Sequence, residues 1–353
     1  MKRRRKNVGA KLTAALLLAA LPAGLGGCGS GGDNISQGML QIEALQYQDA
    51  LDSFLAAENA GENAKLLARG RGIAYMGLTQ YEQAENSFLE ALRQSDGVIE
   101  NVDYDINFYL AAVYSKEEKN REAEEVYDAI LALEPNNVDA LFLRGNVRLK
   151  QGNYTTAKED FDRVAELDGK NFDRLIQLYE VLDYYGYKDA GQGYLTDALQ
   201  NYESQMSAYD KGRMYYYLGE YQKAYQALDE AANKGSAEAY LYLGMAYEAT
   251  GDYNYAANVY NGYLTQDTGN ARIYNQLGLC EMRKGEYQQA LEAFQAGMKI
   301  EGNSLMQSLL FNEIVAYEYL GEYRQATVLM ESYLQTYPDD AAAQREYDFL
   351  RTR

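Results

Sequence analysis

Small and aromatic residues recur along the chain at intervals that fit a repeated pair of helices. The recurring pattern is an aromatic residue four positions after an alanine, with a tyrosine three positions before it in most copies. Its alanines are Ala50, Ala84, Ala123, Ala157, Ala190, Ala224, Ala256, Ala290 and Ala326. Neighbouring copies are 32 to 39 residues apart, most often 34. A period near 34 residues predicts a helix-turn-helix solenoid.

The other small positions in each copy support helical packing. A small residue stands twelve positions before the alanine at Gly38, Gly72, Ala111, Gly145, Gly212, Gly244 and Gly278. The aromatic position is filled by Phe54, Phe88, Tyr127, Phe161, Tyr194, Tyr260 or Phe294. Spacings of three and four place such residues on one face of a helix, where small residues let two helices approach closely. The pattern predicts an all-α chain with nine helix pairs over residues 35–339.

Local signals mark where the predicted helices begin and end. Five copies share a Gly-x-Tyr turn, at Gly152, Gly219, Gly251, Gly285 and Gly321. Glycine there predicts a left-handed helix cap, and the acid that follows in four of them predicts the start of the next helix. The copy around Ala190 has Leu178 at the small position, and the last copy has Ile314. Residues 340–353 predict a closing helix, with Asp339 or Asp340 as its N-cap.

The period and the Gly, Ala and aromatic positions resemble the tetratricopeptide repeat (TPR). Tryptophan is absent from the usual start of the first helix, where Tyr240 and Tyr274 stand in two copies. The resemblance covers nearly all of the chain after residue 34. It implies a right-handed superhelix of about nine repeats plus a C-terminal capping helix, and a non-catalytic role in binding other proteins.

In the TPR family the first helices of the repeats line a concave groove. The resemblance therefore implies a set of partner-binding candidates beside the small position of each first helix. They are Arg69, Phe108, Phe142, Asn146, Tyr209, Arg213, Tyr216, Tyr242, Met245, Asn275 and Phe311. This mostly aromatic and aliphatic set suits an extended peptide or a helix. The alternative is that several of these side chains are core between neighbouring repeats.

The first 27 residues resemble a bacterial lipoprotein signal peptide. Residues 1–11 are basic, and Leu12–Ala23 is an apolar run. Twelve residues extend only about 18 Å as a helix, which is too short for a hydrocarbon core of about 30 Å. The run ends in Leu25-Gly26-Gly27-Cys28, which resembles a lipobox. The resemblance implies cleavage before Cys28, a diacylglycerol on its thiol and a short linker over residues 28–34; an ordinary secretory signal is the alternative.

Composition removes most enzyme classes. The chain has no His and only two Cys, so it lacks a histidine base and cannot form a zinc site of several thiolates. We expect no catalytic residues, no metal and no cofactor. Cys280 lies among apolar residues, which predicts a buried thiol.

Charge narrows the choice of partner. Residues 28–353 carry 27 Lys and Arg side chains against 52 Asp and Glu side chains. An acidic surface repels nucleic-acid phosphates and favours basic or neutral partners.

The sequence therefore predicts a lipid-anchored scaffold on the extracytoplasmic face of a bacterial membrane, the outer membrane if the host has one. Its groove would bind a protein or peptide of the cell envelope. The alternative is a lipoprotein that binds cell-wall glycans through the groove aromatics.

Overall fold

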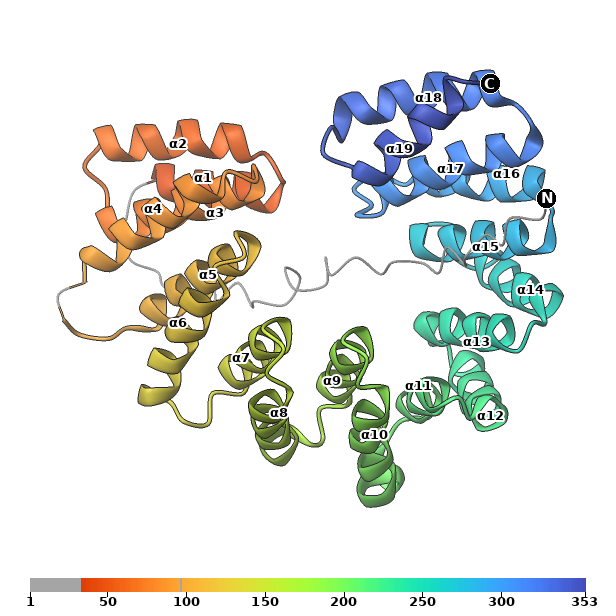
Figure 1. The fold of residues 1–353 in the computed structure, drawn as a ribbon, viewed down its shortest axis with the longest axis horizontal. Coiled ribbons are helices and arrows are strands. Elements are labelled where there is room, and N and C mark those ends of the chain that lie inside the picture. Colours follow the sequence, from red (N-terminus) through yellow and green to blue (C-terminus); the bar gives the residue numbers. More distant parts are fainter. Residues whose placement is uncertain (1–32, 96) are drawn as a thin grey trace. The chain divides into compact units, whose positions relative to one another are not determined.

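The computed structural model describes residues 33–95 and 97–353 (Figure 1). Within those ranges the chain forms nineteen α-helices and one short 3₁₀ helix, without any strand. The all-α prediction is confirmed. The predicted signal peptide 1–27, Cys28 and most of the predicted linker lie outside the described residues. None of the helices from Asp33 onward combines the length and the apolar composition needed to cross a bilayer.

The chain divides into two compact units, with the boundary between Val126 and Tyr127. The first unit contains α1 (Asp33–Glu43), α2 (Tyr47–Asn59), α3 (Ala64–Gly77), α4 (Tyr81–Arg93), α5 (Asn101–Lys116) and the first half of α6 (Asn120–Leu133). The second contains the rest of α6 and α7 (Val138–Lys150), α8 (Tyr154–Asp168), α9 (Phe172–Tyr184), α10 (Lys188–Tyr202), α11 (Ala208–Leu218), α12 (Tyr221–Asn233), α13 (Ala237–Ala249), α14 (Tyr253–Leu264), α15 (Ala271–Lys284), α16 (Tyr287–Met298), α17 (Met306–Leu320), α18 (Tyr323–Thr336) and α19 (Ala341–Leu350). A 3₁₀ turn, Glu203–Gln205, follows α10.

The helices pack in consecutive pairs, each pair being held by the small and large positions that the sequence repeats. Eight of the nine predicted alanines are fully buried, all except Ala190. In five repeats a glycine of the first helix lies against the aromatic ring of the second: Gly38 on Phe54, Gly72 on Phe88, Gly145 on Phe161, Gly244 on Tyr260 and Gly278 on Phe294. A Cβ atom at any of these glycines would come within 3.0 Å of the ring. Because glycine has no side chain, the ring fills the space that a side chain would take at that position.

The pair α9 and α10 corrects the predicted register by one residue. Ala190 is only half-buried, whereas Gly191 is buried and Leu195 is fully buried. The position twelve residues before Gly191 is Tyr179, not Leu178, and a Cβ on Gly191 would lie 2.9 Å from the Tyr179 Cα. Here the large residue is on the first helix and the glycine on the second. The two helices still approach closely, but α9 supplies the large side chain and α10 supplies the glycine.

Every turn within a helix pair contains a residue in the left-handed backbone region at the same place, five positions before the buried small residue. These residues are Leu45, Thr79, Glu118, Gly152, Gly186, Gly219, Gly251, Gly285 and Gly321. The five predicted glycine caps are confirmed, with φ between 77° and 84°. Of the four acids that follow such a glycine, only Asp252 caps with its side chain, accepting a hydrogen bond from the Tyr255 N–H at 3.1 Å.

The last helix covers the end of the second unit. Asp340, and not Asp339, is its N-cap and accepts hydrogen bonds from the N–H groups of Ala342 and Ala343 at 2.9 and 3.0 Å. Ala343 and Leu350 are buried in one cluster with Ile314, Met330 and Tyr333. α19 thus buries apolar surface that α17 and α18 would otherwise expose, as a terminal repeat requires.

Candidate partner-binding surface

The first helices of successive pairs contact one another inside each unit. In the first unit α3 contacts both α1 and α5, and in the second the contacts run from α9 through α11, α13 and α15 to α17. Figure 1 shows these odd-numbered helices following one another along the array. The residues that the sequence predicted for binding lie on these helices and, for Phe142 and Asn146, on α7.

The predicted residues differ in how much surface they offer. Eight are half-buried: Arg69, Phe108, Asn146, Tyr209, Tyr216, Met245, Asn275 and Phe311. Three are buried and so contribute little free surface: Phe142, Arg213 and Tyr242. Phe142 packs against Phe161 with ring centroids 6.2 Å apart, and the Arg174 guanidinium covers its ring at 4.9 Å. For these three the alternative, core between neighbouring repeats, describes their positions.

Four arginines share one arrangement, which we call the arginine clamp. Each guanidinium forms an ion pair with a carboxylate of a neighbouring first helix and lies over an aromatic ring. The ion pairs are Arg69–Asp105, Arg174–Asp139, Arg213–Asp173 and Arg283–Glu248. The rings are Tyr109 at 5.8 Å, Phe142 at 4.9 Å, Tyr209 at 4.3 Å and Tyr253 at 5.9 Å. All four ion pairs therefore join successive repeats, and in three of the clamps the ring also belongs to a neighbouring repeat, whereas Tyr209 is on the same helix as Arg213.

Two predicted binding residues belong to these clamps. Arg213 pairs with Asp173 and also with Asp210 at 2.7 Å, and it is buried. Arg69 pairs with Asp105. Asn275 makes a comparable link, because its Oδ1 accepts a hydrogen bond from the Asn312 amide at 2.9 Å. These three residues have partners inside the array, which ties them to the joints between repeats.

A group of five tyrosines gathers where α9, α11 and α13 meet, and we call it the tyrosine cluster. It consists of Tyr179, Tyr209, Tyr216, Tyr217 and Tyr242. Three of the rings surround Tyr242 at centroid distances of 5.7 to 6.1 Å, and Tyr179 lies 5.1 Å from Tyr217. Such tilted and edge-on packing is favourable for aromatic rings. The cluster combines apolar ring surface with several hydroxyl groups.

Burial keeps the hydroxyl groups of the tyrosine cluster protonated. The Tyr217 hydroxyl donates to Glu180 Oε1 at 2.6 Å and lies 3.3 Å from the Tyr242 hydroxyl. Burial raises the pKa of Tyr179 and of Tyr209 to about 12 and also raises the pKa of Tyr216 and Tyr217. The hydroxyls therefore remain protonated at neutral pH and can donate hydrogen bonds.

The rim of the tyrosine cluster on α9 is acidic and aromatic. Glu180 is half-buried, whereas Asp183 is exposed. Tyr184 is 72% exposed and packs edge-on against Tyr185 at 5.0 Å. Because residues four apart share a helix face, Tyr184 stands one turn beyond Glu180 on the same side of α9. Carboxylate and exposed ring are thus neighbours.

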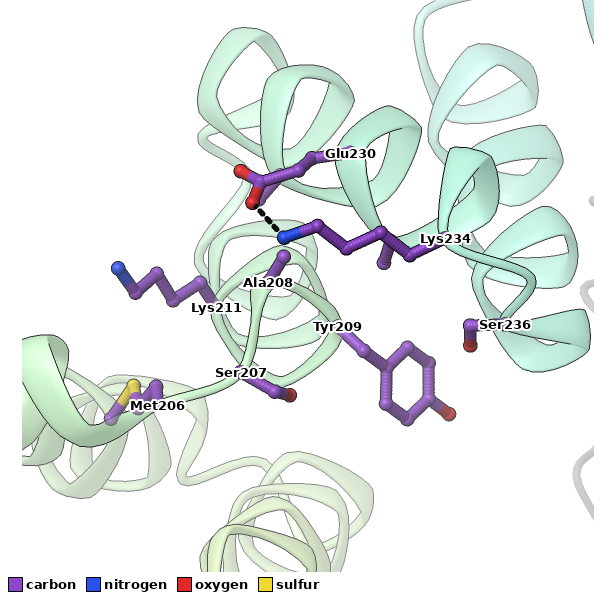
Figure 2. Close-up of a pocket in the computed structure, with 10 residues that line it drawn as sticks. Met206, Ser207, Ala208, Tyr209, Lys211, Glu230, Lys234 and Ser236 are labelled. Atoms are coloured by element: carbon purple, nitrogen blue, oxygen red, sulfur yellow. Dashed lines mark hydrogen bonds and ion pairs between the residues drawn. The ribbon is translucent and has the colours of Figure 1, made fainter.

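An open pocket of about 440 Å³ adjoins the cluster at the ends of α11, α12 and α13 (Figure 2). Tyr209 belongs to both features. Figure 2 shows Tyr209 and Ser236 on one side of the pocket and Lys211 on the other. Lys234 donates to Glu230 at 2.6 Å, so the pocket carries charges of both signs.

The described residues offer no group of His, Cys, Asp and Glu side chains arranged to hold a metal ion. Cys280 is fully buried, as predicted, and its thiol donates to the Tyr253 carbonyl at 3.2 Å. Burial raises the pKa of this thiol to about 12, which keeps it protonated and unreactive.

Three residues of this surface escaped the sequence prediction: Tyr179, Glu180 and Tyr217. Glu180 was missed because the register of the α9–α10 pair was set on Ala190 in place of Gly191, which puts the small position at Leu178 and not at Tyr179. Tyr179 stands beside Leu178, but the prediction took no candidate from this copy, whose small position is filled by a leucine. Gly186 carried the missing signal, since it stands five residues before Gly191 as the turn glycines of other repeats stand before their alanines. Tyr217 belongs to a run of three tyrosines, and composition alone does not tell which of them faces α9.

Comparison with protein families identifies tetratricopeptide repeats in two stretches of the chain. The family described as Tetratricopeptide repeat matches residues 110–172 and 209–271, and a second model with the same description matches residues 271–304. A TPR repeat-containing protein from Methanocaldococcus jannaschii is 25% identical over 248 residues, which are 70% of this chain and 40% of that protein. The chain thus spans less than half of this relative's length.

Solved structures of similar fold are also tetratricopeptide repeat proteins. One from Parabacteroides merdae is 16% identical and has a TM-score of 0.45, with 80% of this chain and 97% of that chain covered. Another is YrrB, described as a TPR protein with an unusual peptide-binding site. It is 23% identical with a TM-score of 0.37, over 47% of this chain and 84% of that chain.

Proposed function

We propose that this chain, which contains tetratricopeptide repeats, is a non-catalytic scaffold that binds a protein partner at a bacterial membrane. Tetratricopeptide repeat proteins generally mediate protein–protein interactions. The observation that carries the proposal is the tyrosine cluster, where the half-buried rings of Tyr209, Tyr216 and Tyr217 on α11 lie against the buried Tyr179 of α9 and Tyr242 of α13. Tyrosine combines large contact area with a polar tip and is enriched where proteins meet.

Attachment to the membrane is the second part of the proposal. It is supported by the sequence Leu25-Gly26-Gly27-Cys28, which resembles a lipobox. Only residues 29–32 separate Cys28 from α1, and five residue steps span at most about 18 Å. A diacylglycerol on Cys28 would therefore hold the first unit close to the bilayer. Its two acyl chains meet the requirement of more than one chain for stable anchoring.

Metabolic labelling with a fatty-acid probe tests the anchor. The wild-type chain should take up the probe and sediment with membranes, while the Cys28→Ala variant should take up none. Cys280→Ala is the matched control, because it removes the other cysteine and should label like the wild type. Labelling of Cys28→Ala, or none of the wild type, would refute lipidation at this residue.

Crosslinking in the native host followed by mass spectrometry tests the scaffold. We expect a defined envelope protein to be captured by the wild type and lost or replaced by scattered contacts with Cys28→Ala. If no protein is captured while the chain stays with purified cell wall, the glycan-binding alternative replaces the scaffold. Capture of the same protein in equal yield by both forms would support binding but contradict the role of the anchor.

A further inference from the structure

The arginine clamps show how this array holds a positive charge. In each of the four, a carboxylate of one repeat and an aromatic ring together receive a guanidinium. The carboxylate supplies a negative charge and the ring supplies its negative face. Together they balance the positive charge of the guanidinium where water is partly excluded. The same pair of groups elsewhere on the first helices would suit a cation in the same way.

The α9 rim of the tyrosine cluster presents that pair of groups. Glu180 already contacts the cluster through the Tyr217 hydroxyl, and the exposed Tyr184 ring stands one turn further along α9. Asp183 adds a second carboxylate between them in sequence and is exposed. Among the described residues, no Lys or Arg forms an ion pair with Glu180 or Asp183. The rim therefore has the ring and the carboxylates of a clamp, with Asp183 exposed and Glu180 half-buried.

The charge of the whole chain points the same way. From residue 28 onward, acidic side chains outnumber basic ones by 52 to 27. An acidic surface draws cationic segments toward it and repels phosphates. The net negative charge of the chain thus attracts a basic protein segment from a distance, and the ring and carboxylates of the α9 rim bind it at close range.

We propose that Glu180, Asp183 and Tyr184, backed by the tyrosine cluster, bind a lysine or arginine side chain from an extended basic segment of the protein partner. This inference rests on the proposed scaffold function and names the partner's chemistry. The partner's cation occupies the rim as the chain's own arginines occupy the clamps. The rings of the cluster pack against the apolar stem of that side chain, since long cationic side chains cover apolar surface while their charge stays polar.

Peptide binding to the full chain in detergent tests the inference by fluorescence anisotropy at about 150 mM salt, where distant charges are screened within about 8 Å. The probes are three labelled twelve-residue peptides that differ only at four positions, filled by Arg, Gln or Glu. The Arg peptide should bind about tenfold more tightly than the Gln peptide, and the Glu peptide should not bind. Equal affinity for the Arg and Gln peptides would overturn the inference.

Matched variants separate a local site from general attraction. Glu180→Gln keeps an acceptor for Tyr217 while removing charge, and Tyr184→Ala removes an exposed ring; each should weaken binding of the Arg peptide about fivefold. Glu292→Gln removes one exposed charge from α16 and should leave affinity nearly unchanged. Equal losses from Glu180→Gln and Glu292→Gln would overturn the site. Circular dichroism checks that each variant is folded.

The two proposals fail in different ways. Capture of an envelope protein in the host, combined with no preference for the Arg peptide, would refute the basic segment and leave the scaffold standing. A preference for the Arg peptide that depends on Glu180, combined with no captured protein, would refute the scaffold and leave a cation-binding rim.

Discussion

At the scale of single residues, the two helices of a repeat meet where a glycine of one helix faces a large side chain of the other. In most repeats the glycine is on the first helix, and the ring comes from the second. In the α9–α10 pair Tyr179 is on the first helix and Gly191 on the second. The close approach of the helices requires one small residue at this joint, and either helix can supply it.

The Gly191→Ala variant tests this joint. Its new Cβ would lie 2.9 Å from the Tyr179 Cα, a backbone atom that cannot rotate away. We expect the free energy of unfolding to fall by about 1–3 kcal/mol from overpacking, measured by urea denaturation. Gly193→Ala is the control in the same helix, because nothing lies within 4 Å of its added methyl. That variant should gain up to about 1 kcal/mol from helix propensity, and a loss from Gly193→Ala as large as that from Gly191→Ala would contradict the packing account.

Glu248 predicts a pH dependence. It is buried, and burial raises the pKa of its carboxyl above the usual 4.5, although the Tyr260 hydroxyl at 2.6 Å and Arg283 oppose the rise. Because the native state then holds the proton more tightly than the unfolded state, the free energy of unfolding falls as pH rises from about 4.5 through the native pKa. Glu248→Gln removes this ionisation but keeps an acceptor for Tyr260.

Denaturation of the wild type and Glu248→Gln from pH 4 to pH 7 measures this effect. The variant also loses the ion pair with Arg283, which lowers its free energy of unfolding. The test is therefore how the difference in free energy of unfolding between the two proteins changes with pH, and not its absolute size. The variant should gain stability relative to the wild type as pH rises. A relative loss over that window would mean that Glu248 is stabilised as a carboxylate in the native state.

At the scale of helices and turns, one backbone position recurs in all nine pairs. Six turns fill the left-handed position with glycine, while Leu45, Thr79 and Glu118 fill it in the first unit. A side chain in this region clashes with its own backbone, most of all when it is β-branched, as Thr79 is. The first unit therefore carries strain in its turns that the glycine turns of the second unit avoid.

The Thr79→Gly variant should relieve that strain. Thr79 has φ of 59° and its side chain is exposed, so little packing is lost. We expect the free energy of unfolding to rise by about 1 kcal/mol, read from chemical denaturation. The reciprocal change, Gly152→Ala, introduces a Cβ at a φ of 83° and should lower it by about 1–2 kcal/mol. Effects of the same sign from both substitutions would refute the turn assignment.

The closing helix depends on its N-cap. Asp340 accepts two backbone hydrogen bonds at the start of α19 and a third from the Tyr333 hydroxyl at 2.7 Å. Asp340→Ala should destabilise α19 by about 0.5–2 kcal/mol and speed amide hydrogen exchange within it. Asp339→Ala, at the exposed neighbouring position, should leave exchange unchanged. Equal exchange in the two variants would show that the cap contributes nothing.

At the scale of the whole molecule, the sequence period predicted the all-helical fold, because the same small and large positions recur in nearly every repeat. The period erred where the composition of a repeat changed, at Tyr179 and Gly191. The binding surface was less predictable. Arg213 and Phe142 occupy first-helix positions that resemble groove positions, yet Asp173 of the preceding repeat pairs with Arg213, and the Arg174 guanidinium of the following repeat, paired with Asp139, covers the Phe142 ring. Those contacts join residues some 35 to 40 positions apart, and a pattern within one repeat does not contain them.

The central claim is that a protein partner binds the surface formed by the first helices. Site-directed photocrosslinking in the host, with p-benzoylphenylalanine in place of Tyr184 on α9 or of Val328 on α18, tests it most directly. Both side chains are well exposed, at 72% and 57%, so their reach into solvent is comparable. We predict capture of one protein from position 184 and none from position 328. Capture from position 328 alone, or of the same protein equally from both, would contradict the claim.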